Sequence, residues 1–137
     1  EKSFGIWNAE FTQGYTPAET GMDRWIDWSK DSFVGSHAAS VELNGNGPNR
    51  RLVTLEVNAD GADASGYEPI WVNNKMVGFV TSGGYGHTMK KSYAMALVDA
   101  DLAKEGTDLT VHIVGVERKA TVIAPSPYDP SGKAMRN

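Results

Sequence analysis

The feature that most constrains the fold is a change in hydrophobic period at residue 50. In the segment RRLVTLEV, the apolar residues Val53, Leu55 and Val57 alternate with polar ones. A period of two places such side chains on one face of a β-strand. Further short alternating segments follow up to residue 124, each bounded by turn residues. About six strands of this kind predict a mainly β fold, a small antiparallel β-barrel.

Two hairpin turns are predicted within this region. Asn73 and Asn74 lie between two alternating runs, and asparagine tolerates the positive φ that a tight hairpin turn requires. A second hairpin is expected around residues 115–117, Gly-Val-Glu. The Ala and Leu content of residues 92–98 would suit a helix, but their neighbours favour a strand, followed by a short turn through Leu102.

The first 44 residues have a different pattern, which predicts a short two-helix segment before the barrel. Thr16 is suited to be an N-cap, Pro17 fits the first helical position, and Glu19 completes a capping box. The stretch GSHAASVEL predicts a second short helix, capped by Ser36. The turn-rich stretch NGNGPN, residues 44–49, is a natural boundary between the two regions.

A stripe of apolar residues follows the first capping box. Met22, Trp25 and Ile26 recur at helical spacing, so they are expected to lie on one face of a helix. Such a stripe is more often part of the core than of a ligand site. The sequence therefore predicts that these three side chains are buried.

Composition and charge exclude several classes of function. The 137 residues suffice for one domain with a core, and the net charge of −4 is spread without blocks that would attract nucleic acid or membrane. The chain has no cysteine, which excludes disulfides and thiolate metal sites. The start EKSFGIWNAEF lacks Met and resembles no signal peptide. We expect a fragment or processed chain, cytoplasmic, or in the mitochondrial matrix if eukaryotic.

The glycine-rich stretch FVTSGGYGHTMKKS, residues 79–92, has some features of a phosphate-binding loop. That loop requires a glycine before its lysine, whereas Lys90 precedes Lys91 here. The stretch also follows a predicted hairpin and not the first strand of a parallel unit. We therefore expect a bend between two barrel strands, in which Gly83 and Gly84 adopt backbone angles poorly accessible to other residues.

No complete catalytic set can be assembled from residue spacing. The three histidines, His37, His87 and His112, lack the spacing of metal ligands and are expected at the surface, with His112 pointing outward from a strand. Trp7 leaves two alternatives open, a core residue and a platform on which a ligand stacks.

Seven segments resemble one known family in their order along the chain. They are EKSFGIW, TPAETGM, DSFVGSHAA, RRLVTLEV, EPIWVNNKMVGFVTSGGYGHTMKKSYAMALV, EGTDLTVHIVG and SPYDPSGK. Together they resemble the C-terminal part of folate-dependent aminomethyltransferases, typified by the glycine cleavage T-protein. The version fused behind the flavin domain of dimethylglycine and sarcosine dehydrogenases is most similar. The most specific motif is G-x-V-T-S-G-x-Y, residues 78–85.

The resemblance implies a one-carbon enzyme of which this chain is one part. A flavin domain carrying FAD would oxidise an N-methyl amine, and tetrahydrofolate would receive the carbon as a methylene group. Residues 1–44 would end the helical folate-binding region, and residues 50–137 would form the C-terminal barrel that closes one side of the folate site. The partners would be the upstream folate-binding and flavin domains of the same parent chain, with no nucleic acid or membrane. The catalytic aspartate of the family lies upstream, so the isolated chain is expected to be inactive.

Four residues are implied as cofactor contacts, and no catalytic or metal residue is assigned. Trp7 stands where T-proteins usually have a tyrosine that lines the folate site, and Tyr85 lies in the motif that faces the domain junction. Tyr128 and Arg136 belong to the tail, which approaches the glutamate end of folate in T-proteins. Two alternatives stay open: a related enzyme with another methyl donor, and a purely structural barrel.

Overall fold

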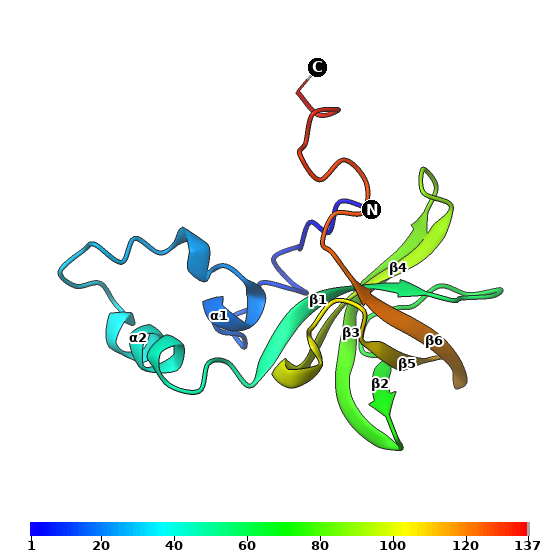
Figure 1. Cartoon of the computed structure of the whole chain (residues 1–137), viewed down its shortest axis with the longest axis horizontal. Coiled ribbons are helices and arrows are strands. Elements are labelled where there is room, and N and C mark those ends of the chain that lie inside the picture. The colour runs from blue at the N-terminus through cyan, green and yellow to red at the C-terminus, as the bar shows by residue number, and fades with distance from the viewer. Residues whose placement is uncertain (137) are drawn as a thin grey trace.

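Residues 50–123 form a closed barrel of six antiparallel strands in the computed structural model, which describes residues 1–136 (Figure 1). The strands are β1 (Arg50–Val57), β2 (Pro69–Val72), β3 (Lys75–Gly86), β4 (Lys91–Asp99), β5 (Asp108–Ile113) and β6 (Val116–Ile123). Their order around the barrel is β1-β4-β3-β2-β5-β6, and β6 pairs back onto β1. The predicted mainly β barrel is therefore confirmed.

The core of the barrel is built from the inward faces of these strands. Val53, Leu55 and Val57 of β1 are all buried, as their alternation predicts. The largest fully buried side chains that the other strands add to this cluster are Ile70, Val80, Val98 and Val111. Burying one such side chain stabilises the fold by about 1.5–3 kcal/mol, so the barrel interior is the main source of stability.

One of the two hairpin turns lies where the sequence predicts it, and the other does not. Asn73 and Asn74 have φ values of 49° and 61°, which confirms the turn between β2 and β3. The second turn consists of Val114 and Gly115, with φ values of 49° and 79°. Residues 116–117 belong to β6, so the turn predicted at 115–117 was placed too far along the chain. Gly115 fits because the second turn residue needs a positive φ, which glycine adopts without strain.

The bend predicted between two strands in residues 79–92 is present, but it lies after the glycines and not at Gly83 and Gly84. β3 runs through Gly83 and Gly84 to Gly86, and the turn to β4 lies at residues 87–90. Neither Gly83 nor Gly84 has a positive φ. Residue 83 must be glycine for lack of space. A Cβ there would lie 2.4 Å from the carbonyl oxygen of Ala64, whose backbone lies close against β3. Nothing lies within 4 Å of a Cβ built at Gly84.

The first predicted helix forms but is short. α1 (Pro17–Thr20) begins with the predicted capping box, in which Thr16 and Glu19 each accept from the other's backbone N–H. Gly21, at φ 69°, ends the helix. Glu19 also pairs with Arg50, whose Nε lies 3.0 Å from the Glu19 carboxylate, and this contact fixes α1 to β1.

The apolar stripe after α1 is not a buried helical face. Because Gly21 stops the helix, residues after it form a single 3-10 turn, η1 (Asp23–Trp25), and Trp25 is 73% exposed. Met22 and Ile26 are only half-buried. The second helix, α2 (Ser36–Asn44), is confirmed, but Gly35 and not Ser36 is its N-cap. Figure 1 shows α1 and α2 to one side of the barrel. Within residues 1–136, no helix is long and apolar enough to cross a membrane.

A buried glutamate fixes the N-terminal segment to the barrel. Glu10 is fully buried, and one carboxylate oxygen accepts a 2.6 Å hydrogen bond from the Ser82 hydroxyl of β3. The other oxygen accepts from the backbone N–H of Ile6 at 2.8 Å. Burial acts to raise the pKa of Glu10, but these hydrogen bonds outweigh it and hold the pKa below its ordinary value. Glu10 is therefore ionised and clamps the N-terminal turn onto β3.

The close approach at Gly83 predicts a difference between two neighbouring glycines. Gly83→Val is expected to lower the free energy of unfolding by about 1–3 kcal/mol, because the new side chain must displace the Ala64 backbone. Gly84→Val is the matched control and is expected to change it by less than about 1 kcal/mol, since space is open there. Urea unfolding of both variants measures the difference. Equal losses at the two positions would show that the Ala64 contact does not restrict Gly83.

The Glu10 clamp predicts a pH-dependent contribution to stability. Because folding lowers the pKa of Glu10, its contribution is fully present above the unfolded-state pKa and is lost as the pH falls through the folded-state value. Glu10→Gln is expected to lower the free energy of unfolding by about 1–3 kcal/mol near neutral pH. The gap between the variant and the parent should shrink as the pH falls through the folded-state pKa of Glu10, because the parent carboxylate then becomes protonated. A gap that stays the same from neutral pH down through the acid range in which the parent stays folded would contradict the clamp.

Candidate functional site

The first residues of the chain and the start of the C-terminal tail meet on the outer face of β1. Figure 1 shows the first residues in blue beside the orange start of the tail. Ser3 is the link between them, because its Oγ accepts from the Thr54 hydroxyl at 2.9 Å and from the backbone N–H of Ser126 at 3.0 Å. Thr54 points away from the core and is buried nevertheless, which its polar position in the alternation did not predict. The terminal segments therefore form a layer over this face of the barrel.

An ion pair and a backbone hydrogen bond complete the contact between the ends. Lys2 Nζ donates to the backbone oxygen of Asp129 and lies 3.3 Å from its carboxylate. Partial burial acts to raise the pKa of Asp129, but Lys2 and the backbone N–H of Lys133 outweigh it and lower the pKa. The backbone N–H of Tyr128 donates to the carbonyl of Glu1 at 3.1 Å. The tail is thus tied to the first residues of the chain.

A cleft of about 460 Å³ opens where this layer meets β3 and β4, and we call it the junction cleft. Its lining residues are Glu1–Phe4, Thr54, 82–86, 93–95 and Pro127. The Glu1 carboxylate accepts from the backbone N–H of Met89 at 2.7 Å, which lowers the pKa of Glu1. Burial raises the pKa of Tyr93, so its phenol is neutral at physiological pH. The cleft therefore combines the neutral phenol of Tyr93 with glycine backbone and the carboxylate of Glu1.

The four residues implied as cofactor contacts occupy different places. Tyr85 is 47% exposed, lines the junction cleft and packs edge-on against His87 at 5.2 Å. Trp7 is 75% exposed, so the alternative of a core residue is wrong. The reason is local, because the carbonyl of Ile6 accepts from three following N–H groups and the tight turn holds the indole outside.

The two tail residues differ in their distance from the cleft. Tyr128 is half-buried beside Glu1, next to Pro127, which lines the cleft. Arg136 is exposed, and its guanidinium donates to the carbonyl of Ser131 within the tail. Neither Trp7 nor Arg136 lines the junction cleft. Of the four residues, only Tyr85 lines the junction cleft, and Tyr128 is adjacent in sequence to Pro127, which also lines it.

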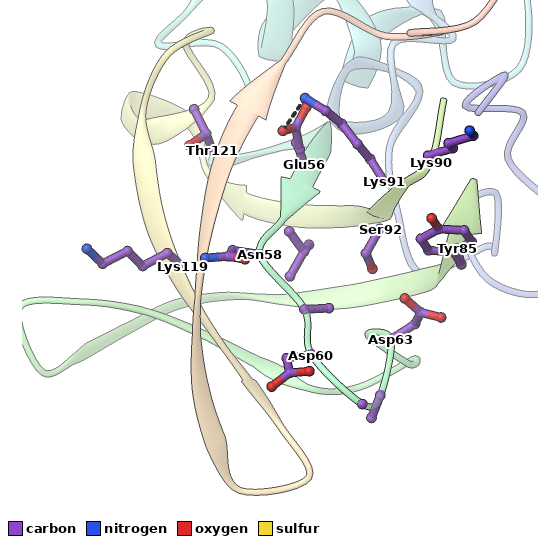
Figure 2. Close-up of a pocket in the computed structure, with 14 residues that line it drawn as sticks. Glu56, Asn58, Asp60, Asp63, Tyr85, Lys90, Lys91, Ser92, Lys119 and Thr121 are labelled. Carbon is purple, nitrogen blue, oxygen red and sulfur yellow. Dashed lines mark hydrogen bonds and ion pairs between the residues drawn. The ribbon is translucent and has the colours of Figure 1, made fainter. Parts of the chain in front are cut away.

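A second cleft, of about 560 Å³, lies on another side of Tyr85, and we call it the loop cleft (Figure 2). It is bounded by the end of β1, the loop of residues 58–63, the start of β4 and part of β6, and its lining includes Glu56, Lys90, Lys91, Ser92, Lys119 and Thr121. Residues 87–90, which precede Ser92, form a hairpin turn and not the strand-loop-helix of a phosphate-binding loop.

Sequence reasoning missed several residues that line the clefts or hold their walls. Glu10, which is buried, and Ser3, which is half-buried, lie in a stretch without regular structure, so no hydrophobic period marks them. Ser92 was assigned only as the start of a strand. The histidines lie on α2, in the turn after β3 and on β5, and His112 stacks on Trp71 at 5.3 Å. Within the described part of the chain, no three His, Cys, Asp or Glu side chains are grouped to hold a metal ion.

Comparison with known proteins identifies the barrel. Residues 50–129 match the family model of the glycine cleavage T-protein C-terminal barrel domain. The chain is 33% identical over 123 residues to mitochondrial dimethylglycine dehydrogenase of Rattus norvegicus and 35% identical over 124 residues to that of Homo sapiens. Each match covers 90% of this chain and 14% of the relative. The aminomethyltransferase of Halalkalibacterium halodurans is 31% identical over 128 residues, which cover 93% of this chain and 34% of the relative.

A solved structure shares the fold. The glycine cleavage system aminomethyltransferase T from Bartonella henselae superposes with a TM-score of 0.82 at 23% identity, over 90% of this chain and 35% of that one. The chain thus spans a minor part of the proteins it matches, and the barrel is the region that the family model covers. The chain belongs to the family of glycine cleavage T-protein C-terminal barrel domains.

Proposed function

We propose that this chain is the C-terminal part of a folate-dependent enzyme of the dimethylglycine or sarcosine dehydrogenase type. The similarity to dimethylglycine dehydrogenases over 90% of the chain supports this branch, and the match covers only 14% of those relatives, so most of such an enzyme would lie outside these residues. The parent would oxidise an N-methyl amine at FAD and pass the one-carbon unit to tetrahydrofolate. FAD would belong wholly to the upstream flavin domain.

The observation that carries the proposal is the junction cleft beside the most specific family motif. Gly83 and Tyr85 of this motif line it, and the N-terminal segment that crosses it is held by Glu10 and Ser3. We infer that residues 1–44 end the folate-binding region and that residues 50–137 close one side of the folate site. Tyr85 would then contact folate or the domain that binds it.

A second candidate is supported by the bacterial relatives. The chain covers 34% of an aminomethyltransferase of the same family, so the parent can also be an enzyme of that length without a flavin domain. Such an enzyme would take its one-carbon unit from another methyl or methylene donor. Flavin absorbance of the purified parent protein separates the two candidates, because only the dehydrogenase type carries FAD. The same localisation applies to both, cytoplasm or mitochondrial matrix, as the mitochondrial relatives suggest.

Removing one hydroxyl tests the role of Tyr85. In the parent enzyme, Tyr85→Phe is expected to weaken tetrahydrofolate binding by about 0.5–1.5 kcal/mol, since one hydrogen bond is lost. Tyr67→Phe is the matched control, because Tyr67 is 85% exposed on the loop before β2 and lines neither cleft. Calorimetric titration with tetrahydrofolate measures both. An unchanged dissociation constant for Tyr85→Phe would remove Tyr85 from the folate site.

The isolated chain tests whether the catalytic groups lie outside these 137 residues. We expect the 137-residue chain to show no flavin absorbance, no oxidation of dimethylglycine or sarcosine, and no methylene transfer to tetrahydrofolate. Absorbance spectra and a dye-coupled amine oxidation assay measure this, with the parent protein as the positive control. Turnover by the chain alone would place catalytic groups within these residues and contradict the proposal.

A further inference from the structure

The loop cleft contains a buried hydroxyl that has no partner. Ser92, at the start of β4, is 6% exposed, and its Oγ has no hydrogen-bond partner within residues 1–136. The residue lines the cleft and pairs with Tyr85 of β3 in the sheet. A buried hydroxyl without a partner costs free energy, which a bound group can recover by one hydrogen bond. Ser92 therefore marks a place in the cleft where a polar ligand is favoured.

Three groups of different chemistry converge at this place. Figure 2 shows the Ser92 hydroxyl, the Asp63 carboxylate and the Tyr85 ring pointing into the same part of the cleft. A carboxylate supplies negative charge, a hydroxyl oxygen accepts an N–H hydrogen bond, and an aromatic ring attracts a cation through its π-face. All three favour an ammonium group. An anion would instead face the carboxylate of Asp63.

The loop that carries Asp63 is held against β3. Ala64 is 3% exposed and reaches β3 because Gly83 has no side chain. Further along the loop, the backbone N–H of Tyr67 donates to the carbonyl oxygen of Val80 at 2.7 Å. The backbone N–H of Val80 donates to the backbone carbonyl oxygen of Glu68 at 2.8 Å. These contacts hold the backbone that follows Asp63 against β3, the strand that carries Tyr85, and Asp63 itself is exposed to the cleft.

The lysines of the cleft do not occupy the convergence point. Lys91 Nζ pairs with the Glu56 carboxylate at 2.6 Å. The amino groups of Lys90 and Lys119 point away from Ser92 and Asp63 in Figure 2, and both residues are exposed. Asp60 adds a second carboxylate to the lining of the cleft. The volume of about 560 Å³ exceeds that of a bare ammonium ion and admits organic substituents.

We propose that the loop cleft binds the ammonium group of an organic amine. Asp63 is its counter-ion, Ser92 Oγ accepts a hydrogen bond from its N–H, and the Tyr85 ring covers it. The site shares Tyr85 with the folate role proposed above but uses its ring and not its hydroxyl, and it requires only residues of this chain. The amine is either a free small molecule or the side chain of a lysine on a partner protein.

Nuclear magnetic resonance titration of the ¹⁵N-labelled chain tests the site. The probes are methylammonium chloride, tetramethylammonium chloride and Nα-acetyl-lysine methylamide, with sodium acetate at equal ionic strength as the anion probe. Methylammonium is expected to shift the amide signals of residues 58–63, 85 and 92 with saturation. It should bind more tightly than tetramethylammonium, which has no N–H for Ser92. Tighter binding of the lysine derivative than of methylammonium supports the site and assigns it to a protein side chain, and the reverse order assigns it to a free amine.

Matched variants separate the site from non-specific charge attraction. Asp63→Asn is expected to weaken methylammonium binding about tenfold, because the counter-ion is lost. Asp101→Asn removes the same charge from an exposed residue that does not line the cleft, and binding should persist. Ser92→Ala should weaken binding of methylammonium but not of tetramethylammonium. The dispersion of the spectrum reports whether each variant is folded.

Three results would overturn the proposal. One is the absence of saturable shifts from any amine up to about 100 mM, well above a millimolar dissociation constant. Another is equal binding by folded Asp63→Asn and Asp101→Asn. The third is a shift of the same amide signals by acetate in preference to the amines, which would make the cleft an anion site. None of these results bears on the tetrahydrofolate titration of Tyr85→Phe, so the two proposals fail independently.

Discussion

The structure depends on the pairing of β1 with strands on both of its sides. β1 pairs with β4 from Arg50 to Val57 and with β6 from Thr54 to Val57, and the second ladder closes the barrel. Closure leaves no exposed sheet edge and gathers the inward side chains into one core. The outer face of β1 then becomes a platform, on which Arg50 holds α1 and Thr54 holds Ser3.

Both clefts follow from close contacts that join loops to this barrel, one polar and one steric. Glu10 is ionised and buried, so the segment around it is held to Ser82 by hydrogen bonds that must form together. On the other side of Tyr85, the loop carrying Asp63 lies against β3 because Gly83 leaves room for the Ala64 backbone. The motif around Tyr85 is therefore needed for more than one surface, which explains why glycine and small polar residues gather there.

Most of the barrel is predictable from sequence because its period and turn chemistry are local. The alternation of Val53 and Leu55, the capping box at Thr16 and the asparagine turn before β3 all appear in the structure. Other predictions failed because they concern contacts between residues far apart in the sequence. The need for glycine at Gly83 arises from a loop about twenty residues earlier, and the burial of Glu10 arises from Ser82. Trp25 was misassigned because one glycine ends α1 before the apolar stripe can continue as a helix.

The central claim is that the junction cleft faces the folate site of a larger enzyme. Hydrogen–deuterium exchange of the parent protein, with and without tetrahydrofolate, tests it without any substitution. Increased protection is expected for residues 1–10, 82–86 and 126–129, which form and flank the cleft. The turn between β5 and β6, at Val114 and Gly115, lines neither cleft and should exchange at the same rate in both states. Unchanged exchange around the cleft, in a protein shown to bind tetrahydrofolate, would contradict the claim.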